Sequence, residues 1–427
     1  MVLFVVGIVL LLLALYGTPL FVIISAIALL AFHLADIDAS AVIIELYRLA
    51  NQPVLLAIPL FTFAGYMLAE SNTPRRLVRL SQALLGWIPG GLAIVVLVSC
   101  SIFTAFTGAS GVTIIALGGL LFPVLLHENY PEKFSLGLLT VSGNLGLLFP
   151  PSLPIILYGL VSQTSIDRLF VAGILPGLLM VGVLSLYSIF FVKRHSGVTE
   201  RKPVSGTEVF QSIKEAGWEI PLPVIILGGI YGGFFTATEA AAITAFYVFV
   251  VEVFVYRDIS IKNDLRRVIH DSMVLVGGIL VILAAALGLA NYMIDAEIPN
   301  RILDTLQVYI TSKIGFLLIL NLFLLLVGAI MDIFSAIMVV APIVIPIALS
   351  FGVDPVHLGV IFLANLGIGY STPPVGMNLF IASFRFEKPV LKLYVATIPF
   401  LIFLLIALIL ITYLPQLSLW LVNLFGI

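Results

Sequence analysis

The sequence predicts an all-α, polytopic membrane protein, and two bulk observations support that fold class. Hydrophobic residues make up 61% of the 427 residues, charged residues only 10%, and the mean hydropathy is +1.23. A soluble domain carries about 25% charged residues. Apolar runs of roughly 20 residues recur along the whole chain, and each is long enough to cross a bilayer core about 30 Å thick. Nucleic-acid binding is not indicated, because the 20 Lys and Arg residues are scattered among loops.

The apolar runs predict helices in a definite order. The first is expected to be a retained helix and not a signal peptide, because it has no basic leader and no small-residue cleavage site. Two segments with charged, amphipathic patterns, 70–91 and 295–309, are expected to lie at the lipid interface. The apolar segments are 2–16, 18–34, 53–70, 90–106, 111–126, 135–161, 169–192, 221–234, 237–256, 272–293, 314–329, 333–350, 357–383 and 393–414.

Two pairs of these segments are better explained as re-entrant hairpins than as crossings. The hairpins are expected over 90–126 and 314–350, with arms of about 16 residues, which is short for a span. Each has a polar or glycine-containing tip, "FTGASGVT" at 106–113 and "VGAIMDIFSA" at 327–336. The alternative is that all the apolar segments cross the bilayer.

The distribution of positive charge favours the hairpins. With the N-terminus outside and each hairpin returning to its own side, sixteen of the 20 basic residues fall in inside loops. This asymmetry follows the positive-inside rule. Only Arg48, Arg168, Arg301 and Lys313 then lie outside.

Two predicted spans contain proline pairs, which predict two broken helices. "GNLGLLFPPSL" (143–153) lies within 135–161, and "NLGIGYSTPPVG" (365–376) lies within 357–383. Proline removes a backbone donor and clashes with the preceding turn, at a cost of roughly 3 kcal/mol in a helix interior. In hydrocarbon the freed carbonyls find no water. A kink satisfied by neighbouring Ser or Thr is the alternative for a single break.

The breaks and hairpin tips recur at nearly the same separation along the chain, which indicates an internal repeat. We expect one repeat over 1–193, a hydrophilic cytoplasmic linker over 194–220 and a second repeat over 221–427. The charge pattern gives the two repeats opposite orientations. In transporters built this way, substrate and coupling ions bind near the midplane at discontinuous helices.

Few polar groups lie deep in the predicted spans, so each is a candidate for function. Asp332 at the second tip and Glu239 in "FFTATEAAA" are the clearest acids, and each has a helix-capping role as its alternative. The first tip offers the hydroxyls of Ser110 and Thr113. The nearest basic residue is Arg48, whose alternative role is an interface anchor.

At the level of whole motifs, the chain resembles the large permease subunit of the TRAP (tripartite ATP-independent periplasmic) transporters. The motifs include "FTGASGVTIIALGG", "GNLGLLFPPSLPIILYG", "GGFFTATEAAAI" and "LANLGIGYSTPPVGMNLFIA", and the resemblance covers nearly the whole chain. It implies a sodium-driven secondary transporter of the bacterial inner membrane that works by an elevator motion between a scaffold and a transport domain. It also implies a small four-helix membrane subunit and a periplasmic binding protein that delivers an organic anion.

The resemblance further implies two sodium sites and a substrate site. Where the family commonly shows "TPTEA", this chain has "TATEA", so unwinding beside Glu239 is less certain. The first Na+ site would involve Gly108, Ser110, Asn144, Gly146 and Pro150, and the second Gly328, Asp332, Gly367 and Thr372, with Glu239 as a further ligand. The substrate would contact Ser110, Thr113, Ser371, Thr372 and Arg48.

Rival functions receive little support from the sequence. A membrane enzyme would need a catalytic motif such as His-Glu-x-x-His or Gly-x-Ser-x-Gly, and neither occurs. A channel would show a continuous polar face or a ring of charges. An uncoupled, channel-like permease and a proton-coupled permease remain the alternatives to sodium coupling, and the sequence does not name the anion.

Overall fold

Every regular element in the described part of the chain is helical. The computed structural model describes residues 18–35, 51–88, 90–194, 205–310 and 312–426, with the single residues 12, 13, 38, 44 and 47. In chain order the elements are α2 (Leu20–Leu34), η1 (Pro53–Leu56), α4 (Ala57–Glu70), α5 (Thr73–Leu85), α6 (Gly91–Thr107), α7 (Ser110–Thr113), η2 (Ile114–Gly118), α8 (Gly119–His127), α9 (Glu132–Leu145), η3 (Gly146–Leu148), α10 (Leu153–Ser162), α11 (Ile166–Arg194), α12 (Gly206–Glu215), α13 (Pro221–Tyr231), α14 (Ala237–Val250), η4 (Val251–Val255), α15 (Leu265–Asp295), α16 (Ile298–Tyr309), α17 (Lys313–Ile330), α18 (Ile333–Ser350), α19 (Pro355–Gly369), α20 (Met377–Phe386), α21 (Val390–Tyr413) and α22 (Gln416–Phe425).

The helices confirm a multi-pass membrane protein. Among the described residues, eight helices are long and apolar enough to cross a membrane, or up to nine if the bent pair α9–α10 counts as one span. The longest, α15, has 31 residues and is therefore about 46 Å long, which exceeds a bilayer core of about 30 Å. This excess length allows α15 to tilt or to reach past the interface.

The observed helices differ from the predicted spans at two places. The span predicted over 221–234 is only the 11-residue helix α13, because the chain turns at Gly232 and Gly233, and Gly233 adopts the left-handed conformation. The sequence did not predict α22 beyond Pro415, because its ten residues follow the last span directly. The segment expected over 2–16 lies almost wholly outside the described residues.

Each predicted hairpin consists of two helical arms joined by a very short tip. Hairpin 1, residues 91–127, comprises α6 and the continuous run α7–η2–α8, which meet at Gly108 and Ala109. Hairpin 2, residues 313–350, comprises α17 and α18, with Met331 and Asp332 between them. The arms of hairpin 2 have 18 residues each, longer than the 16 expected, and each is long and apolar enough to cross a membrane. Arm length alone therefore does not make these hairpins re-entrant.

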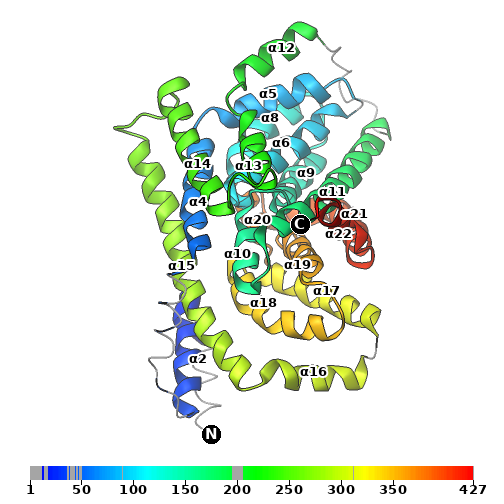
Figure 1. Cartoon of the computed structure of the whole chain (residues 1–427). Helices are drawn as coiled ribbons and strands as arrows, with labels where there is room; N and C mark the ends of the chain where they lie inside the picture. The colour runs from blue at the N-terminus through cyan, green and yellow to red at the C-terminus, as the bar shows by residue number, and fades with distance from the viewer. Residues whose placement is uncertain are drawn as a thin grey trace.

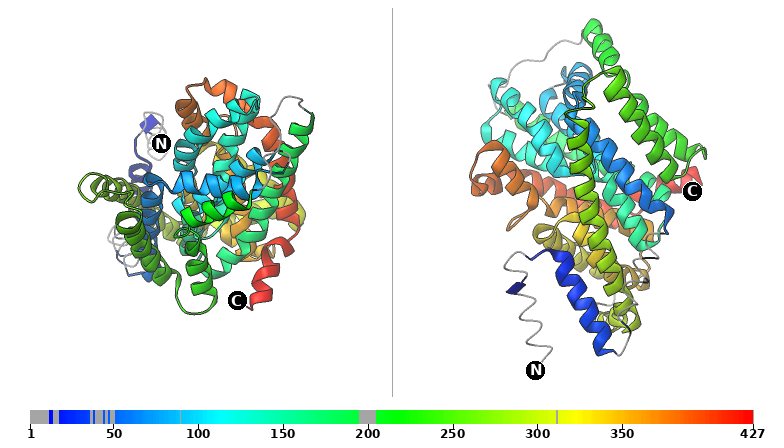
Figure 2. Two further views of the ribbon diagram at one scale, coloured as in Figure 1. Left: turned by 90° about the horizontal axis from the view of Figure 1, so that it is seen from above. Right: turned by 90° about the vertical axis from the view of Figure 1, so that its left-hand side faces the viewer.

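Helices α2, α4, α14 and α15 form an outer layer along one side of a buried centre (Figure 1). The long helix α15 runs beside α2 and α4, and α14 packs on α4 (Figure 1). The amphipathic helix α16 crosses between α15 and α17 at one end of the molecule, whereas α5 and α12 lie together at the other end (Figure 2). The central helices α9, α10 and α19 are almost completely buried, so the first interrupted helix and the first half of the second lie in the interior, whereas α20 is buried on one face only.

One arginine fixes the amphipathic helix α5 to the outer layer. Arg76 pairs with Glu219, with Glu252 at 3.2 Å and with Asp258 at 2.7 Å, and its guanidinium stacks on the Tyr256 ring at 3.8 Å. Burial raises the pKa of Asp258, but hydrogen bonds from Asn72 and the charge of Arg76 outweigh burial, so the pKa is lowered overall. The cluster joins Arg76 to Glu219 of the predicted linker and to Glu252 and Asp258 beyond it.

We expect Arg76→Gln to lower the free energy of unfolding by about 3–5 kcal/mol, because two buried carboxylates lose their counter-charge. The matched control is Arg79→Gln on the same helix, whose ion pair with Glu215 is half exposed and contributes about 0–1 kcal/mol. Thermal unfolding of the purified protein in detergent measures both. Equal shifts for the two variants would contradict the prediction.

Candidate functional site

The first interrupted helix breaks at its proline pair. α9 tightens into the 3₁₀ turn η3 and ends at Leu148, and α10 begins at Leu153 with the chain bent by 46°. Phe149 adopts an extended conformation, and the Pro150–Pro151 peptide bond is cis. Because proline cannot donate to the helix ladder, the ladder stops here and α10 starts anew behind Ser152. The structure therefore has the break that the sequence predicted within 135–161.

The second interrupted helix breaks in the same manner. α19 ends at Gly369, residues 370–376 are not helical, and α20 begins at Met377. The Pro373–Pro374 bond is also cis, and Gly376 adopts a positive φ of 47° that favours glycine. This is the break predicted within 357–383. Each break leaves one helix C-terminus and one helix N-terminus. The ends at the first break, Leu148 and Leu153, are buried, whereas Met377 at the second is 42% exposed.

The tip of hairpin 1 packs on the first break. The Thr104 hydroxyl donates to the carbonyl of Gly143 at 2.9 Å and lies 2.6 Å from the Thr113 hydroxyl on the other arm. Gly108, with φ of 67°, lies against Leu153, so that a Cβ there would be 2.6 Å from the leucine side chain. Gly146 approaches the α6 backbone equally closely, with Ala105 N 2.8 Å from its Cβ position. Glycine is required at these contacts because any side chain would separate tip and break.

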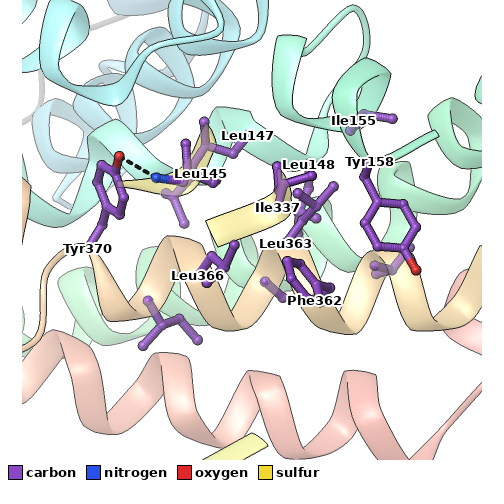
Figure 3. Close-up of a cluster of buried hydrophobic side chains, with 14 of the residues drawn as sticks. Leu145, Leu147, Leu148, Ile155, Tyr158, Ile337, Phe362, Leu363, Leu366 and Tyr370 are labelled. Atoms are coloured by element: carbon purple, nitrogen blue, oxygen red, sulfur yellow. Dashed lines mark hydrogen bonds between the residues drawn. The ribbon is translucent and has the colours of Figure 1, made fainter. Parts of the chain in front are cut away.

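The tip of hairpin 2 packs on the second break. The backbone N–H of Ile333 donates to the Tyr370 hydroxyl at 2.7 Å, and Gly376 N donates to the carbonyl of Ala329 at 2.8 Å. Gly328 and Gly369 pack backbone against backbone. Figure 3 shows the Tyr370 bond beside the buried cluster in which Leu145, Leu147 and Leu148 of the first break meet α19. The two tips and two breaks therefore share one continuous core.

Side-chain hydrogen bonds join the two breaks directly. Asn144 donates from Nδ2 to the Ser371 hydroxyl at 2.7 Å and accepts at Oδ1 from Asn378 Nδ2 at 2.7 Å. The Ser110 hydroxyl of hairpin 1 donates to Asn378 Oδ1 at 2.9 Å. These four residues, Ser110, Asn144, Ser371 and Asn378, are at most 4% exposed and are called the central cluster below. They come from opposite halves of the chain.

The structure brings together many of the residues selected from sequence. Ser110, Asn144 and Ser371 belong to the central cluster, and Thr113 bonds to Thr104, whose hydroxyl donates to the carbonyl of Gly143 beside Asn144. Gly367 faces Asn144, with its Cβ position 3.8 Å from the asparagine Cβ. The remaining members at the tips and breaks are Gly108, Gly146, Pro150, Gly328 and Asp332.

Three further site residues predicted from the sequence do not belong to the central cluster. Glu239 is exposed and forms a capping box with Thr236 at the start of α14, so the capping alternative describes its position and it does not join the central cluster. The Thr372 hydroxyl donates to the carbonyl of Ile368 at 2.8 Å, which fills its donor role but leaves an oxygen lone pair. Arg48 lies outside the described residues.

Asp332 combines a cap with a position at the second tip. Its Oδ1 accepts the backbone N–H of Ser335 at 2.9 Å, so it is the N-cap of α18. The carboxylate is only partly buried. Among the described residues no group of three or more His, Cys, Asp or Glu side chains could hold a metal ion. Apart from Asp332, the oxygen atoms around the breaks that could coordinate a cation belong to hydroxyls, amides and backbone carbonyls.

Sequence reasoning missed Asn378 and Tyr370. Asn378 is the second residue of α20 and links Ser110 to Asn144, and Tyr370 holds the start of α18. A polar residue directly after a helix break in an apolar span was the available signal for Asn378. Nothing local distinguishes Tyr370 from the other aromatic residues of the chain.

The fold and these paired breaks define a membrane protein of the secondary-transporter class, in which discontinuous helices meet in the interior. A solved structure of the Alcanivorax borkumensis YdaH transporter shares the fold, with a TM-score of 0.66 over 87% of each chain at 14% identity. The family described as "Tripartite ATP-independent periplasmic transporter, DctM component" matches residues 4–417.

Curated relatives agree with that match. The chain is 34% identical to the C4-dicarboxylate TRAP transporter large permease protein DctM of Vibrio cholerae serotype O1, covering 93% of this chain and 92% of that protein. It is 37% identical to the protein of the same name from Pseudomonas aeruginosa, covering 94% and 93%. The sialic acid TRAP transporter large permease protein SiaM of Vibrio cholerae is 33% identical, covering 87% and 86%. The chain therefore belongs to the family of TRAP transporter large permease subunits, and these relatives are permeases and not enzymes.

Proposed function

We propose that this permease imports a small organic anion across the bacterial inner membrane by coupling it to a sodium gradient. The single observation that carries the proposal is the central cluster, in which Asn144 at one break bonds to Ser371 and Asn378 at the other. Buried polar groups of this kind are costly in a membrane protein unless they are satisfied and used.

Helix ends at the breaks supply the groups that such a function needs. The N-termini of α10 and α20 carry the positive ends of helix dipoles, which favour a carboxylate. The C-termini of η3 and α19 carry carbonyl oxygens, which favour a hard cation such as Na+. Asp332 would add a negative charge at the second tip.

A division into scaffold and transport domain fits the packing. Helices α2, α4, α14 and α15 form the outer layer, and the Arg76 cluster fixes α5 to it, whereas both hairpins pack on the breaks. We place the hairpins and interrupted helices in a moving domain that carries substrate past this layer as an elevator. Amphipathic α5 and α16 would lie at the two interfaces with lipid.

The partners follow from the family. The large permease of a tripartite system works with a small membrane subunit and a periplasmic binding protein. The isethionate permease protein DctMQ of Oleidesulfovibrio alaskensis, 36% identical over 370 residues, is a longer chain of which this match covers 58%. Relatives are named for C4-dicarboxylates, sialic acid, isethionate and ectoine, so the delivering protein would set the choice among such substrates.

Uptake into proteoliposomes tests the proposal. The permease is reconstituted with its small subunit, the binding protein is added outside with radiolabelled anion, and a sodium, proton or no gradient is imposed. Uptake should require both the sodium gradient and the binding protein. Uptake driven equally by a proton gradient, or flux without the binding protein, would replace the proposal by the proton-coupled or channel-like alternative.

A further inference from the structure

We infer that Arg385 is a positioning residue that holds hairpin 1 against α20 and so keeps the central cluster assembled. Its role in transport rests on the function proposed above, but the contacts that define it do not. Arg385 lies seven residues after Asn378, two helical turns along the same face of α20. Asn378 bonds to the tip of hairpin 1, and Arg385 bonds to the same arm further from the tip.

The contact between α20 and the second arm of hairpin 1 is a continuous seam. The Asn378–Ser110 bond lies at the tip, and Ile381 packs against Gly111, whose Cβ position is 2.6 Å from the isoleucine Cδ1. Further along, the ring of Phe386 lies 2.9 Å from the Cβ position of Gly118. Phe386 also packs on Phe122, with ring centroids 4.9 Å apart.

Arg385 acts at the one irregular turn of this arm. Residues 114–118 form the π-helix η2, where the regular α-helical ladder is interrupted. Arg385 Nε donates to the Ile115 carbonyl within that turn at 2.8 Å. A charge-assisted hydrogen bond of this kind is stronger than a neutral one. Within the described part of the chain, Arg385 of α20 is the only side chain that donates a hydrogen bond to η2.

The guanidinium also requires a glycine beneath it. Arg385 lies directly over Gly119, so close that a Cβ at that position would overlap its Nη2 and Cζ atoms, with Nε 2.6 Å away. An alanine would therefore displace the flexible end of the arginine without moving any backbone. The Gly119→Ala substitution therefore removes the Arg385 contact without changing Arg385 itself.

The C-terminal end of α20, which carries Arg385, is joined to the start of α9. The Ser383 hydroxyl donates to the Lys388 carbonyl at 2.6 Å, and both Lys388 and Lys392 pair with Glu132 at the start of α9, each at 2.7 Å. The end of α20 is thus joined to the start of α9, so Arg385 links the second arm of hairpin 1 to both interrupted helices. Loss of the bond should loosen the arm around the π-turn while the rest of the fold stays intact.

Hydrogen–deuterium exchange on the purified full-length protein in detergent tests the inference without any transport assay. Arg385→Gln and Gly119→Ala should each speed exchange of amides 110–120 about tenfold, equivalent to about 1.4 kcal/mol. Exchange of α19 should not change, and the melting temperature should fall little.

Because both changes remove the same contact, the double variant should exchange no faster than either single variant. Arg385→Lys, which keeps the charge but loses the planar donor, should give an intermediate rate.

A matched control separates the contact from general effects. Gly182→Ala adds a Cβ where no atom lies within 4 Å, so it repeats the glycine-to-alanine change without any contact to displace. This variant should not alter exchange at 110–120. Unchanged exchange in Arg385→Gln, additive effects in the double variant, or faster exchange throughout the protein would each overturn the inference.

Sodium distinguishes this inference from the proposed function. Replacing choline chloride by sodium chloride should slow exchange around Ser110 and Asn378 in the unmodified protein if the breaks bind Na+. Absence of that sodium effect would count against the proposed ion site. The change caused by Arg385→Gln in choline chloride would still decide the role of Arg385.

Discussion

Asn144→Ala should abolish sodium-driven uptake and lower the free energy of unfolding by about 3 kcal/mol. Asn144 is 3% exposed and makes both side-chain bonds that join the two breaks, to Ser371 and from Asn378. Truncation removes the acceptor of Asn378 Nδ2 and the donor to Ser371, whose hydroxyl keeps only a long bond to the Thr140 carbonyl at 3.4 Å, and a buried polar group without its partner costs about 1–3 kcal/mol. The measurements are uptake into proteoliposomes and thermal unfolding in detergent.

An exposed asparagine provides the control for this substitution. Asn423 in α22 lies at the surface, so Asn423→Ala should leave both uptake and unfolding unchanged. Asn144→Asp tests the chemistry further, because it keeps an acceptor for Asn378 but removes the donor to Ser371. Wild-type uptake by Asn144→Ala would mean that the central cluster is not part of the transport site.

Asp332→Ala should also abolish sodium-driven uptake while leaving membrane insertion intact. Asp332 lies at the tip of hairpin 2 and caps α18 through Ser335 N. Loss of the cap alone would cost about 1 kcal/mol. Loss of a charge that binds Na+ would instead remove coupling. Uptake is measured with and without a sodium gradient, and insertion by the yield of folded protein.

Asp332→Asn separates these two roles, because asparagine is as good an N-cap as aspartate but carries no charge. If the charge binds sodium, Asp332→Asn fails like the alanine variant. Asp354 supplies the matched control: it caps α19 by accepting from Val356 N and His357 N, and Asp354→Asn should keep uptake. Full sodium-dependent uptake by Asp332→Asn would reduce Asp332 to a structural cap.

Much of the site's framework was predictable because its causes are local. A proline pair interrupts a helix wherever it occurs, so both breaks could be located without knowledge of the neighbours. The hairpin tips were recognisable from glycine and polar residues between apolar runs. The helix at 221–231 was predicted too long, because a run of apolar residues does not reveal where Gly232 and Gly233 turn the chain.

The hydrogen-bond partners within the site were less predictable, because they depend on packing between residues far apart in the sequence. Ser110 and Asn378 are separated by 268 positions, and Asn144 and Ser371 by 227. Nothing in either local sequence specifies the other. Glu239 illustrates the reverse case: its capping box is a local pattern, and the structure shows that capping box at the start of α14.

The sequence by itself determined that this protein spans the membrane and that two of its helices are interrupted, since apolar content and proline chemistry act residue by residue. Tertiary structure alone decided that the interruptions lie together, that Asn144 joins them and that Arg385 bonds to the π-turn of hairpin 1. The physical reason is that a hydrogen bond requires its two groups to come within about 3 Å. For residues hundreds of positions apart, only the packed fold brings them to that distance.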